Sequence, residues 1–556
     1  MSRELCQRAG AKAYIAGSIS SLGSEYVLGL KAMNCNSGDT LAQEQVTANG
    51  KEKVLNAVGD AAAKLRGRLG ESLATVQKFD VPLPEATTAS LEALKAYSLG
   101  EKTFGESSAA DALPFYQRAI ELDPSFPAAY AALGNSYYRL AEEGRAIEYY
   151  VKAFQLRAHA SEREKLDISG DYYASALGDL NKATEVYLQK VRMYPRDPRG
   201  YFNLGGVYSS LGQYEKAIEK YRQSISVSPD RVDAYENLIN ALLALRRFDE
   251  AAQTAEQAQA RKLDDTTLHN ALYALAFLSG DSSGMEEQQR WYVGRIDENV
   301  GLSLQSDTEA YAGHMRKARE LTTRAVDSAI RDDSKETAAL WQEIAAQREA
   351  VSGNTAYATE AAVQGLKLYP ASHEVKVEAA LALAMAGDLS RAEALVQDLN
   401  RQYPHATQIQ AIWLPSVQAK LALNRPNPAL ALSILQADSP IELGTIDFVA
   451  NLNCLYPKYI RAEAYLAAGQ GTRAAAEFQK VVDNSGIVWN CWTGALARLG
   501  MARANALQAK NSTGADADAA HVRALVGYKD FLTRWKDVDP DIPIYKAAKA
   551  EYAKLQ

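Results

Sequence analysis

The sequence predicts a mainly α-helical protein: a right-handed solenoid of about ten helical hairpins, some degenerate, preceded by a small α/β domain. Alanines at nearly constant spacing predict the solenoid, and tyrosines follow the first four of them by four residues. The alanines are Ala112, Ala146, Ala183, Ala217 and Ala251, and the tyrosines are Tyr116, Tyr150, Tyr187 and Tyr221. A period in the range of 20–50 residues is typical of repeat architectures. Alternating apolar residues near the N-terminus predict the α/β domain.

The unit that starts at Pro127 shows what each repeat is expected to form. Its first helix has an apolar face, because residues three or four apart share one side of a helix. The members of this face are Tyr130, Leu133, Gly134 and Tyr137. The second helix carries Ala146 and Tyr150, and we expect small residues where the two helices approach most closely. A period of about 34 residues with these residues is the signature of the tetratricopeptide repeat (TPR). One hairpin cannot bury its own apolar face, so the repeats must stack.

The spacing also predicts the domain boundaries. Regular repeats occupy 91–265, degenerate helical repeats 266–335, and TPR-like repeats with a capping helix 336–556. An irregular loop is expected around Asp438–Gly444. Residues 76–90 form a linker, which Pro82 and Pro84 stiffen.

The first 75 residues predict a thin α/β domain. After a short helix, the alternating runs Ala13–Ser20, Glu25–Asn34 and Thr40–Ala48 are separated by polar turns, which is typical of an antiparallel meander. Lys51–Leu69 then has helical periodicity. Because the first helix begins almost at Met1, we expect a domain that lacks its front part.

Several segments resemble a known family. The runs Ala13–Ile19, Tyr26–Lys31 and Asn36–Asp39 are similar to the last strands of the TolB-like α/β domain. The segments Gly70–Lys78, Ser90–Tyr97 and Trp535–Pro543 resemble the C-terminal half of acidobacterial-type serine/threonine protein kinases. In that family a kinase domain and a membrane helix precede TolB-like and TPR regions. Neither the kinase domain nor the membrane helix has a counterpart in this sequence.

The composition excludes some classes of function. The net charge of −7 and the pI of about 5.7 give no support to nucleic-acid binding, which usually needs a basic surface. No run of 18 apolar residues exists, so the sequence predicts no membrane segment. Met1–Cys6 shows no apolar signal core. The chain as written is therefore expected to be cytoplasmic. The resemblance to membrane kinases implies the alternative of an extracytoplasmic location.

The four cysteines leave two interpretations open. Cys6 and Cys35 lie near the N-terminus, Cys454 and Cys491 lie near the C-terminus, and none forms a CxxC motif. They can be four buried free thiols, or two disulfides in an oxidising compartment. In the resembled architecture, where the repeats can lie outside the cytoplasm, Cys6 can pair with Cys35 and Cys454 with Cys491.

No motif predicts catalysis, a metal site or a cofactor. The sequence has no P-loop, GxGxxG, HExxH, DFG triplet or kinase catalytic loop. Gly280–Gly284 matches GxSxG, but a helical segment precedes it where a nucleophile elbow needs a strand. An independent hydrolase that uses Ser282 is therefore a third and weak hypothesis. Asp537, Asp539 and Asp541 lack the glycine and closing glutamate of a calcium loop.

The expected concave face offers candidate binding residues. Counting positions from each repeat start places Asn135, Arg139, Arg199, Asn203 and Asn237 on the face that the first helices line. Asparagine can donate and accept hydrogen bonds to the backbone of an extended peptide. Arginine can bind a carboxylate with two hydrogen bonds. The set is partly similar to TPR grooves that clamp a C-terminal carboxylate, but Ala131 stands where those grooves have a lysine.

The sequence therefore predicts a non-catalytic TPR scaffold that binds a protein or peptide on its concave face, in bacterial signalling or assembly. It predicts no nucleic-acid partner and no small-molecule cofactor. The alternative is the detached sensory and partner-binding region of a transmembrane serine/threonine kinase, whose kinase domain is missing from this chain.

Overall fold

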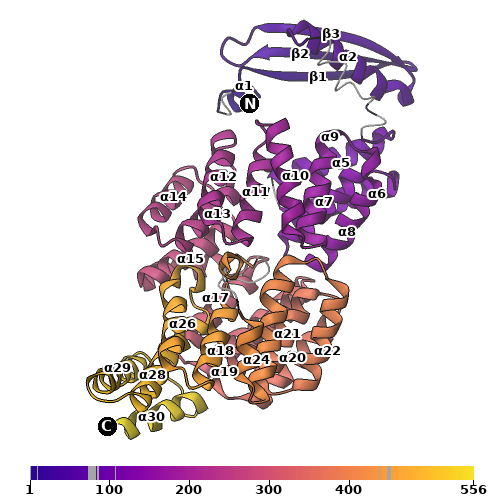
Figure 1. Cartoon of the computed structure of the whole chain (residues 1–556). Coiled ribbons are helices and arrows are strands. Elements are labelled where there is room, and N and C mark those ends of the chain that lie inside the picture. The colour runs from indigo at the N-terminus through magenta and orange to yellow at the C-terminus, as the bar shows by residue number, and fades with distance from the viewer. Residues whose placement is uncertain are drawn as a thin grey trace.

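A small sheet domain is followed by a long stack of helical hairpins in the computed structural model of the chain (Figure 1). The structure describes residues 2–8, 11–72, 83, 87–106, 108–436, 439–446 and 453–556. The predicted linker 76–90 lies mostly outside these residues, including Pro82 and Pro84, and so does Asp438 in the predicted irregular loop. Figure 1 shows the sheet at one end of the molecule and the C-terminal helices at the opposite end.

The N-terminal domain is the predicted antiparallel meander. Helix α1 (Ser2–Arg8) leads into strands β1 (Ala13–Leu22), β2 (Glu25–Asn34) and β3 (Thr40–Asn49), and helix α2 (Val54–Arg68) follows a short 3-10 turn. The strand order is β1-β2-β3, and both pairs are antiparallel. The prediction of three strands and a helix is confirmed, because short polar turns and alternating patterns are local signals.

Helix α2 covers β2 and β3 but leaves the apolar side chains of β1 exposed. Ile15 pairs with Ala32 and Ile19 pairs with Leu28, so all four side chains lie on one face of the sheet. Ala32 and Leu28 are 0% and 4% exposed, whereas Ile15 and Ile19 are 63% and 54% exposed. Strand β1 is also an edge strand among the described residues, which leaves one side of its backbone without a strand partner.

The remaining described chain is almost entirely helical. Its first helices are α5 (Leu91–Glu106), α6 (Ala109–Leu122), α7 (Pro127–Arg139), α8 (Glu143–Leu156), α9 (Glu162–Asp171), α10 (Leu180–Met193), α11 (Pro198–Ser210), α12 (Tyr214–Val227), α13 (Val232–Ala244) and α14 (Phe248–Ala260). The middle of the stack contains α15 (Thr266–Ser279), α16 (Ser282–Tyr292), α17 (Glu298–Tyr311), α18 (Met315–Arg331), α19 (Lys335–Ser352), α20 (Thr355–Leu368), α21 (His373–Ala386) and α22 (Leu389–Gln402). The last helices are α23 (Leu414–Asn424), α24 (Pro428–Ile434), α25 (Tyr456–Ala467), α26 (Gly471–Asp483), α27 (Ser485–Val488), α28 (Trp492–Asn511), α29 (Ala515–Arg534) and α30 (Pro543–Leu555).

Each of the first four hairpins places a glycine of its first helix against a tyrosine of its second. A Cβ atom built on Gly205 would lie 2.6 Å from the ring of Tyr221, and one on Gly134 would lie 2.6 Å from the ring of Tyr150. Both tyrosines are buried. Protein interiors are close-packed and leave no room for such an overlap, so these positions require glycine. The prediction of small residues at the closest approach is confirmed.

The hairpins share one core over most of the stack. A continuous cluster of buried apolar side chains extends from Leu180 in α10 to Ala548 in α30. Smaller clusters lie between the first hairpins, for example around Leu133 and Tyr150. Stacked repeats bury apolar surface mainly against their neighbours, which produces a continuous core of this kind. The prediction of a helical solenoid is confirmed.

Candidate functional site: a cavity on the concave face

The first helices of the repeats line a cavity of about 980 Å³. It contains residues from α7, α11, α13 and α15 on one side and from α19 and α21 on the other. All five predicted groove residues, Asn135, Arg139, Arg199, Asn203 and Asn237, line it. The stack therefore brings together, in one space, side chains that are up to about a hundred residues apart in the sequence.

A first contact between distant repeats closes this cavity. The turn before α8 meets the start of α19, and we call residues 141–145 with 333–337 the first seam. Gly144 donates its backbone N–H to Oε2 of Glu336 at 2.8 Å, and Thr337 donates its hydroxyl to the carbonyl of Ala141 at 3.1 Å. Arg145 pairs with Asp333 at 3.3 Å. The solenoid thus turns back on itself after about 190 residues.

Buried carboxyl groups lie in the first seam. Glu142 is 2% exposed, and burial raises its pKa to about 7, although Arg145 and the N–H groups that begin α19 oppose the shift. Glu336 is fully buried, and burial together with the carboxylate of Glu374 raises its pKa. His373 counteracts burial at Glu374 and holds the pKa of that carboxyl below its usual value. The seam therefore combines protonatable carboxyls with two facing helix N-termini.

A second seam joins residues 209–214 to residues 440–446. The backbone N–H of Thr445 donates to the carbonyl of Ser209 at 3.0 Å, and the hydroxyl of Tyr214 donates to the carbonyl of Leu443 at 2.5 Å. Gly212 has a φ of +71°, and a Cβ there would overlap the carbonyl of Pro440. Thr445 and Ile446, which directly follow the predicted irregular loop, line the cavity.

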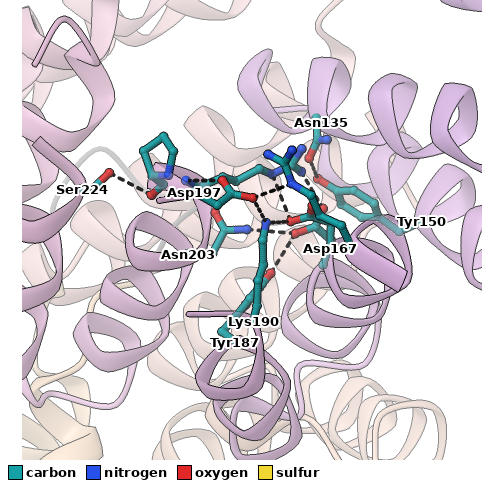
Figure 2. A network of polar contacts seen from close by, with 12 residues as sticks. Asn135, Tyr150, Asp167, Tyr187, Lys190, Asp197, Asn203 and Ser224 are labelled. Carbon is teal, nitrogen blue, oxygen red and sulfur yellow. Dashed lines mark hydrogen bonds and ion pairs between the residues drawn. The ribbon is translucent and has the colours of Figure 1, made fainter. Parts of the chain in front are cut away.

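Arg199 and Asn203 lie in a polar network between α9, α10 and α11 (Figure 2). Arg199 pairs with Asp171 at 2.8 Å, and Asn203 donates its side-chain amide to Asp171 at 3.2 Å. Tyr187 donates its hydroxyl to the same carboxylate at 2.7 Å. Burial opposes the charge of Arg199, but the carboxylates of Asp171 and Asp167 raise its pKa above the usual value. The network fixes Arg199 and Asn203 at the wall of the cavity.

Lysine and aspartate side chains complete this network. Lys190 has no exposed surface and pairs with Asp167 and, at 3.2 Å, with Asp197. Arg163 also pairs with Asp197 at 2.9 Å. Figure 2 shows Lys190, Asp167 and Asp197 converging between the helices. Each buried charge therefore has an opposite charge beside it, as a low-dielectric environment requires.

Arg139 and Asn135 are also engaged within the chain. Arg139 ends α7 and pairs with Asp265 at 2.6 Å and with Asp233 at 3.5 Å, across 126 and 94 residues. The side chain of Asn135 accepts a hydrogen bond from the hydroxyl of Tyr150 at 3.0 Å. The two arginines considered for a carboxylate clamp are therefore both already paired with carboxylates.

Three lining asparagines, Asn240, Asn270 and Asn299, were missed by sequence reasoning, and the first two have an unpaired buried oxygen. Asn240 lies one turn after Asn237 on α13, is 7% exposed, and donates to Glu236 at 2.6 Å, while its Oδ1 has no hydrogen-bond partner. Asn270 on α15 also has an Oδ1 without a partner. The spacing of 33 residues between Asn237 and Asn270 was a usable signal. Asn240 does not recur at the repeat spacing, so no pattern in the sequence identifies it as a lining residue.

The lining is acidic, which the sequence did not predict. Ten aspartate and glutamate side chains and four arginines line the cavity, with no lysine among the described lining residues, so the formal charge is −6 with His373 neutral. Each of the four arginines pairs with a carboxylate. The pairs are Arg139–Asp265 at 2.6 Å, Arg145–Asp333 at 3.3 Å, Arg199–Asp171 at 2.8 Å and Arg231–Asp233 at 2.8 Å.

The GxSxG motif and the three aspartates Asp537, Asp539 and Asp541 do not lie in the structural context that a nucleophile elbow or a metal site needs. Ser282 begins α16, and a helix, α15, precedes it, so a strand–turn–helix elbow is absent at this place. Asp539 accepts the backbone N–H of Arg316 at 2.7 Å, and Asp541 pairs with the side chain of Arg316 at 3.1 Å. Within the described ranges, no group of acidic, histidine or cysteine side chains has the arrangement of a metal site.

The cysteines lie in two pairs. The structure joins Cys6 to Cys35 and Cys454 to Cys491, and the Cα atoms of each pair are 5.7 Å apart. The first pair ties α1 to the end of β2, and the second ties the segment before α25 to the start of α28. In the described part of the chain, no helix is both long and apolar enough to cross a bilayer.

Comparisons with known proteins agree with the repeat pattern. Residues 110–140, 127–159, 172–225 and 208–276 each match a family model described as a TPR or tetratricopeptide repeat. Among curated proteins, no sequence matches the chain.

Similar solved structures include three repeat proteins. Yeast Tom70 is 13% identical with a TM-score of 0.30, and the match covers 83% of this chain and 95% of that one. PilF of Pseudomonas aeruginosa is 20% identical with a TM-score of 0.27, over 37% of this chain and 95% of that one. YrrB, described as a TPR protein with an unusual peptide-binding site, is 21% identical with a TM-score of 0.22, over 32% and 91%. The helical part of the chain is an α-solenoid with TPR repeats matched within residues 110–276, and a three-stranded sheet precedes it.

Proposed function

We propose that this chain is a non-catalytic scaffold that binds an extended segment of a partner protein inside the concave cavity. The observation that carries this proposal is the row of asparagines from the first helices α7, α11, α13 and α15, namely Asn135, Asn203, Asn237 and Asn270, along a cavity of about 980 Å³. Side-chain amides can both donate to and accept from a peptide backbone. Solenoids use their concave surfaces for binding in general, and this volume is of the size that holds a short segment. The resemblance to bacterial kinase tails supports a role in bacterial signalling.

Replacement of Asn237 by alanine is expected to weaken peptide binding at least fivefold, with no change in thermal stability. Loss of one hydrogen bond to a ligand costs about 1 kcal/mol, which corresponds to this factor, and no hydrogen bond within the described chain holds the Asn237 side chain. Peptides selected from a random display library on the full chain supply the ligand, and calorimetry measures the affinity. The double variant with Asn203→Ala is expected to bind more weakly still, but also to melt earlier, because Asn203 donates to buried Asp171. Unchanged affinity in both variants contradicts the asparagine hypothesis.

The alternative, a detached region of a membrane kinase, is favoured by the N-terminal domain. The exposed Ile15 and Ile19 lie on the face that α2 covers over the other strands. A further helix or strand on this face would bury them. The two cysteine pairs are consistent with an oxidising compartment outside the cytoplasm. An antibody to the repeats, applied to lysate of the source cells, separates the two proposals: a band near 60.5 kDa supports a separate scaffold, and a much larger membrane-bound band supports the kinase region.

Limited proteolysis is expected to remove residues 1–75 before the repeats are cut. Three strands and one helix bury little apolar surface, and β1 keeps an exposed apolar face and a free edge. Mass spectrometry of the surviving fragment, with and without a reducing agent, checks the result. Survival of residues 1–75 while the repeats are cut contradicts the idea of an incomplete domain.

A further inference from the structure

Four aspartates recur at the start of successive repeats beside the cavity. Asp233 lies in the first turn of α13, Asp265 and Asp297 directly precede α15 and α17, and Asp332 lies three residues before α19. Their spacings of 32, 32 and 35 residues are close to the repeat length, so the four carboxylates lie near the starts of four consecutive first helices, although not at the same cap position. We call these four residues the acidic row.

A cation of the chain itself already occupies part of this row. The guanidinium of Arg139 reaches from α7 to Asp265 at 2.6 Å and to Asp233 at 3.5 Å, and its side chain remains 31% exposed. It also lies 5.8 Å from the ring centroid of Phe104. The row therefore demonstrably accepts a guanidinium that enters from the cavity, and an aromatic ring lies beside that guanidinium.

The remaining charge of the row is not neutralised. Among the described residues, Arg139 and Arg231 are the two cations that pair with these four carboxylates, and Arg231 contacts Asp233. Burial raises the pKa of Asp297, and the carboxylates of Asp265 and Asp332 raise it further, while Thr266 and Arg139 oppose the shift. An added cation would stabilise the ionised row.

An independent observation points to a ligand that donates hydrogen bonds. Asn240 lines the same cavity and is 7% exposed, and its buried Oδ1 atom has no hydrogen-bond partner among the described residues. Asn240 lies on the same face of α13 as Asp233 and Glu236, because residues three and four apart share one side of a helix. A buried acceptor without a partner costs about 1–3 kcal/mol, which a ligand N–H group can recover.

We propose that the bound segment carries a positively charged side chain, arginine above all, which binds the acidic row in the place that Arg139 occupies here. This proposal rests on the proposed peptide-binding function and specifies its ligand. A negatively charged segment would instead enter a cavity of formal charge −6 in which all four arginines are already paired. Arginine suits the row better than lysine, since its planar fork can bridge two carboxylates. Arg139 then acts as an internal competitor that yields its carboxylates when the partner binds.

Short labelled peptides test the proposal with the full chain. The probes are Gly-Ser peptides with a central pair of arginines, lysines, glutamines or glutamates, and fluorescence anisotropy measures their binding at low salt. We expect the arginine peptide to bind about tenfold or more tightly than the glutamine peptide, and the glutamate peptide to bind least. The affinity should fall as salt rises, because exposed charges are screened.

Paired variants locate the binding. Asp265→Asn with Asp297→Asn is expected to weaken the arginine peptide about tenfold; asparagine caps helices as well as aspartate does, so the fold is retained. The matched control, Glu286→Gln with Glu287→Gln, removes the same charge from exposed positions of α16 that do not line the cavity and should leave affinity nearly unchanged. Arg139→Gln is expected to increase affinity several-fold, a gain that misfolding cannot produce.

Several results would overturn the inference. The first is that the arginine peptide binds neither the wild type nor the Arg139→Gln variant, and the second is that the glutamate peptide binds as tightly as the arginine peptide. The third is that the control pair loses as much affinity as the Asp265→Asn with Asp297→Asn pair, and the fourth is that Arg139→Gln binds the arginine peptide more weakly than the wild type does. If library peptides bind in an Asn237-dependent way but are neutral or acidic, the charge proposal fails and the peptide-binding function stands. If no library peptide binds, the proposed function itself fails.

Discussion

Replacement of Arg348 by methionine is expected to destabilise the middle of the solenoid by about 3–5 kcal/mol, since it leaves a buried carboxylate without its cation. Arg348 on α19 is 5% exposed and pairs with Asp307 on α17, which is 3% exposed. It also donates to the hydroxyl of Thr322 on α18 at 2.9 Å. Burial already raises the pKa of Asp307, and Arg348 is the group that opposes this shift. Hydrogen exchange of α17–α19 measures the local effect, because a repeat stack does not unfold as one unit.

The matched control is Arg316→Met on the neighbouring helix α18. Arg316 pairs with Asp541, but the two side chains are 63% and 62% exposed, so its loss should cost at most about 1 kcal/mol. The double variant Arg348→Met with Asp307→Leu should recover much of the stability, because it removes both buried charges. Similar exchange rates in the Arg348 and Arg316 variants would contradict the assignment of a buried ion pair.

The first seam is expected to become less stable as the pH rises from about 5 to 8. Burial raises the pKa of Glu142 from 4.5 to about 7, and the pKa of Glu336 is also raised. A carboxyl whose pKa is higher in the folded state favours folding while protonated, so its contribution is complete below its unfolded pKa and is lost as the pH rises through the folded value. At about 1.4 kcal/mol for each pKa unit, Glu142 alone accounts for about 3 kcal/mol.

Hydrogen exchange in residues 141–145 and 333–337 at pH 5.5 and pH 8 measures this effect, after correction for the intrinsic dependence of exchange on pH. The double variant Glu142→Gln with Glu336→Gln should remove most of the difference and protect the seam at pH 8. The groups that face these carboxyls, Arg145, Asp333, Glu374 and His373, remain in the variant. If the pH dependence survives the double substitution, one of these four groups causes it instead of Glu142 and Glu336. Since the seam closes the cavity, the same variant tests whether pH controls access for a ligand.

Much of the fold followed from local patterns in the sequence. The spacing from Ala112 to Ala251 predicted the hairpins, and the expectation of small residues at the closest approach was confirmed, for example by Gly205 against Tyr221. The strand Glu25–Asn34 has the predicted bounds. These features depend on contacts within one repeat or one hairpin, which recur in the sequence at fixed distances. The exposed apolar face of β1 in the N-terminal domain was not predicted, because its exposure depends on where α2 lies on the sheet.

The candidate site was predicted only in part. All five predicted residues line the cavity, since repeat position fixes which side of a helix faces inward. Their partners were not predicted: Arg199 with Asp171 joins two repeats, and Arg139 with Asp265 joins repeats that are far apart in the sequence. Asn240 has no signal in the repeat period, and the acidity of the lining becomes visible only when the lining residues are known.

The sequence by itself therefore determined that the chain builds stacked helical hairpins, which residues pack inside each hairpin, and which side chains face the concave surface. Only the tertiary structure decided that the stack closes, with residues 141–145 on 333–337 and residues 209–214 on 440–446. Closure depends on the small rotation between neighbouring repeats, summed over many of them. A local pattern does not contain that sum, so the cavity, its paired arginines and its acidic row emerge at the level of the folded chain.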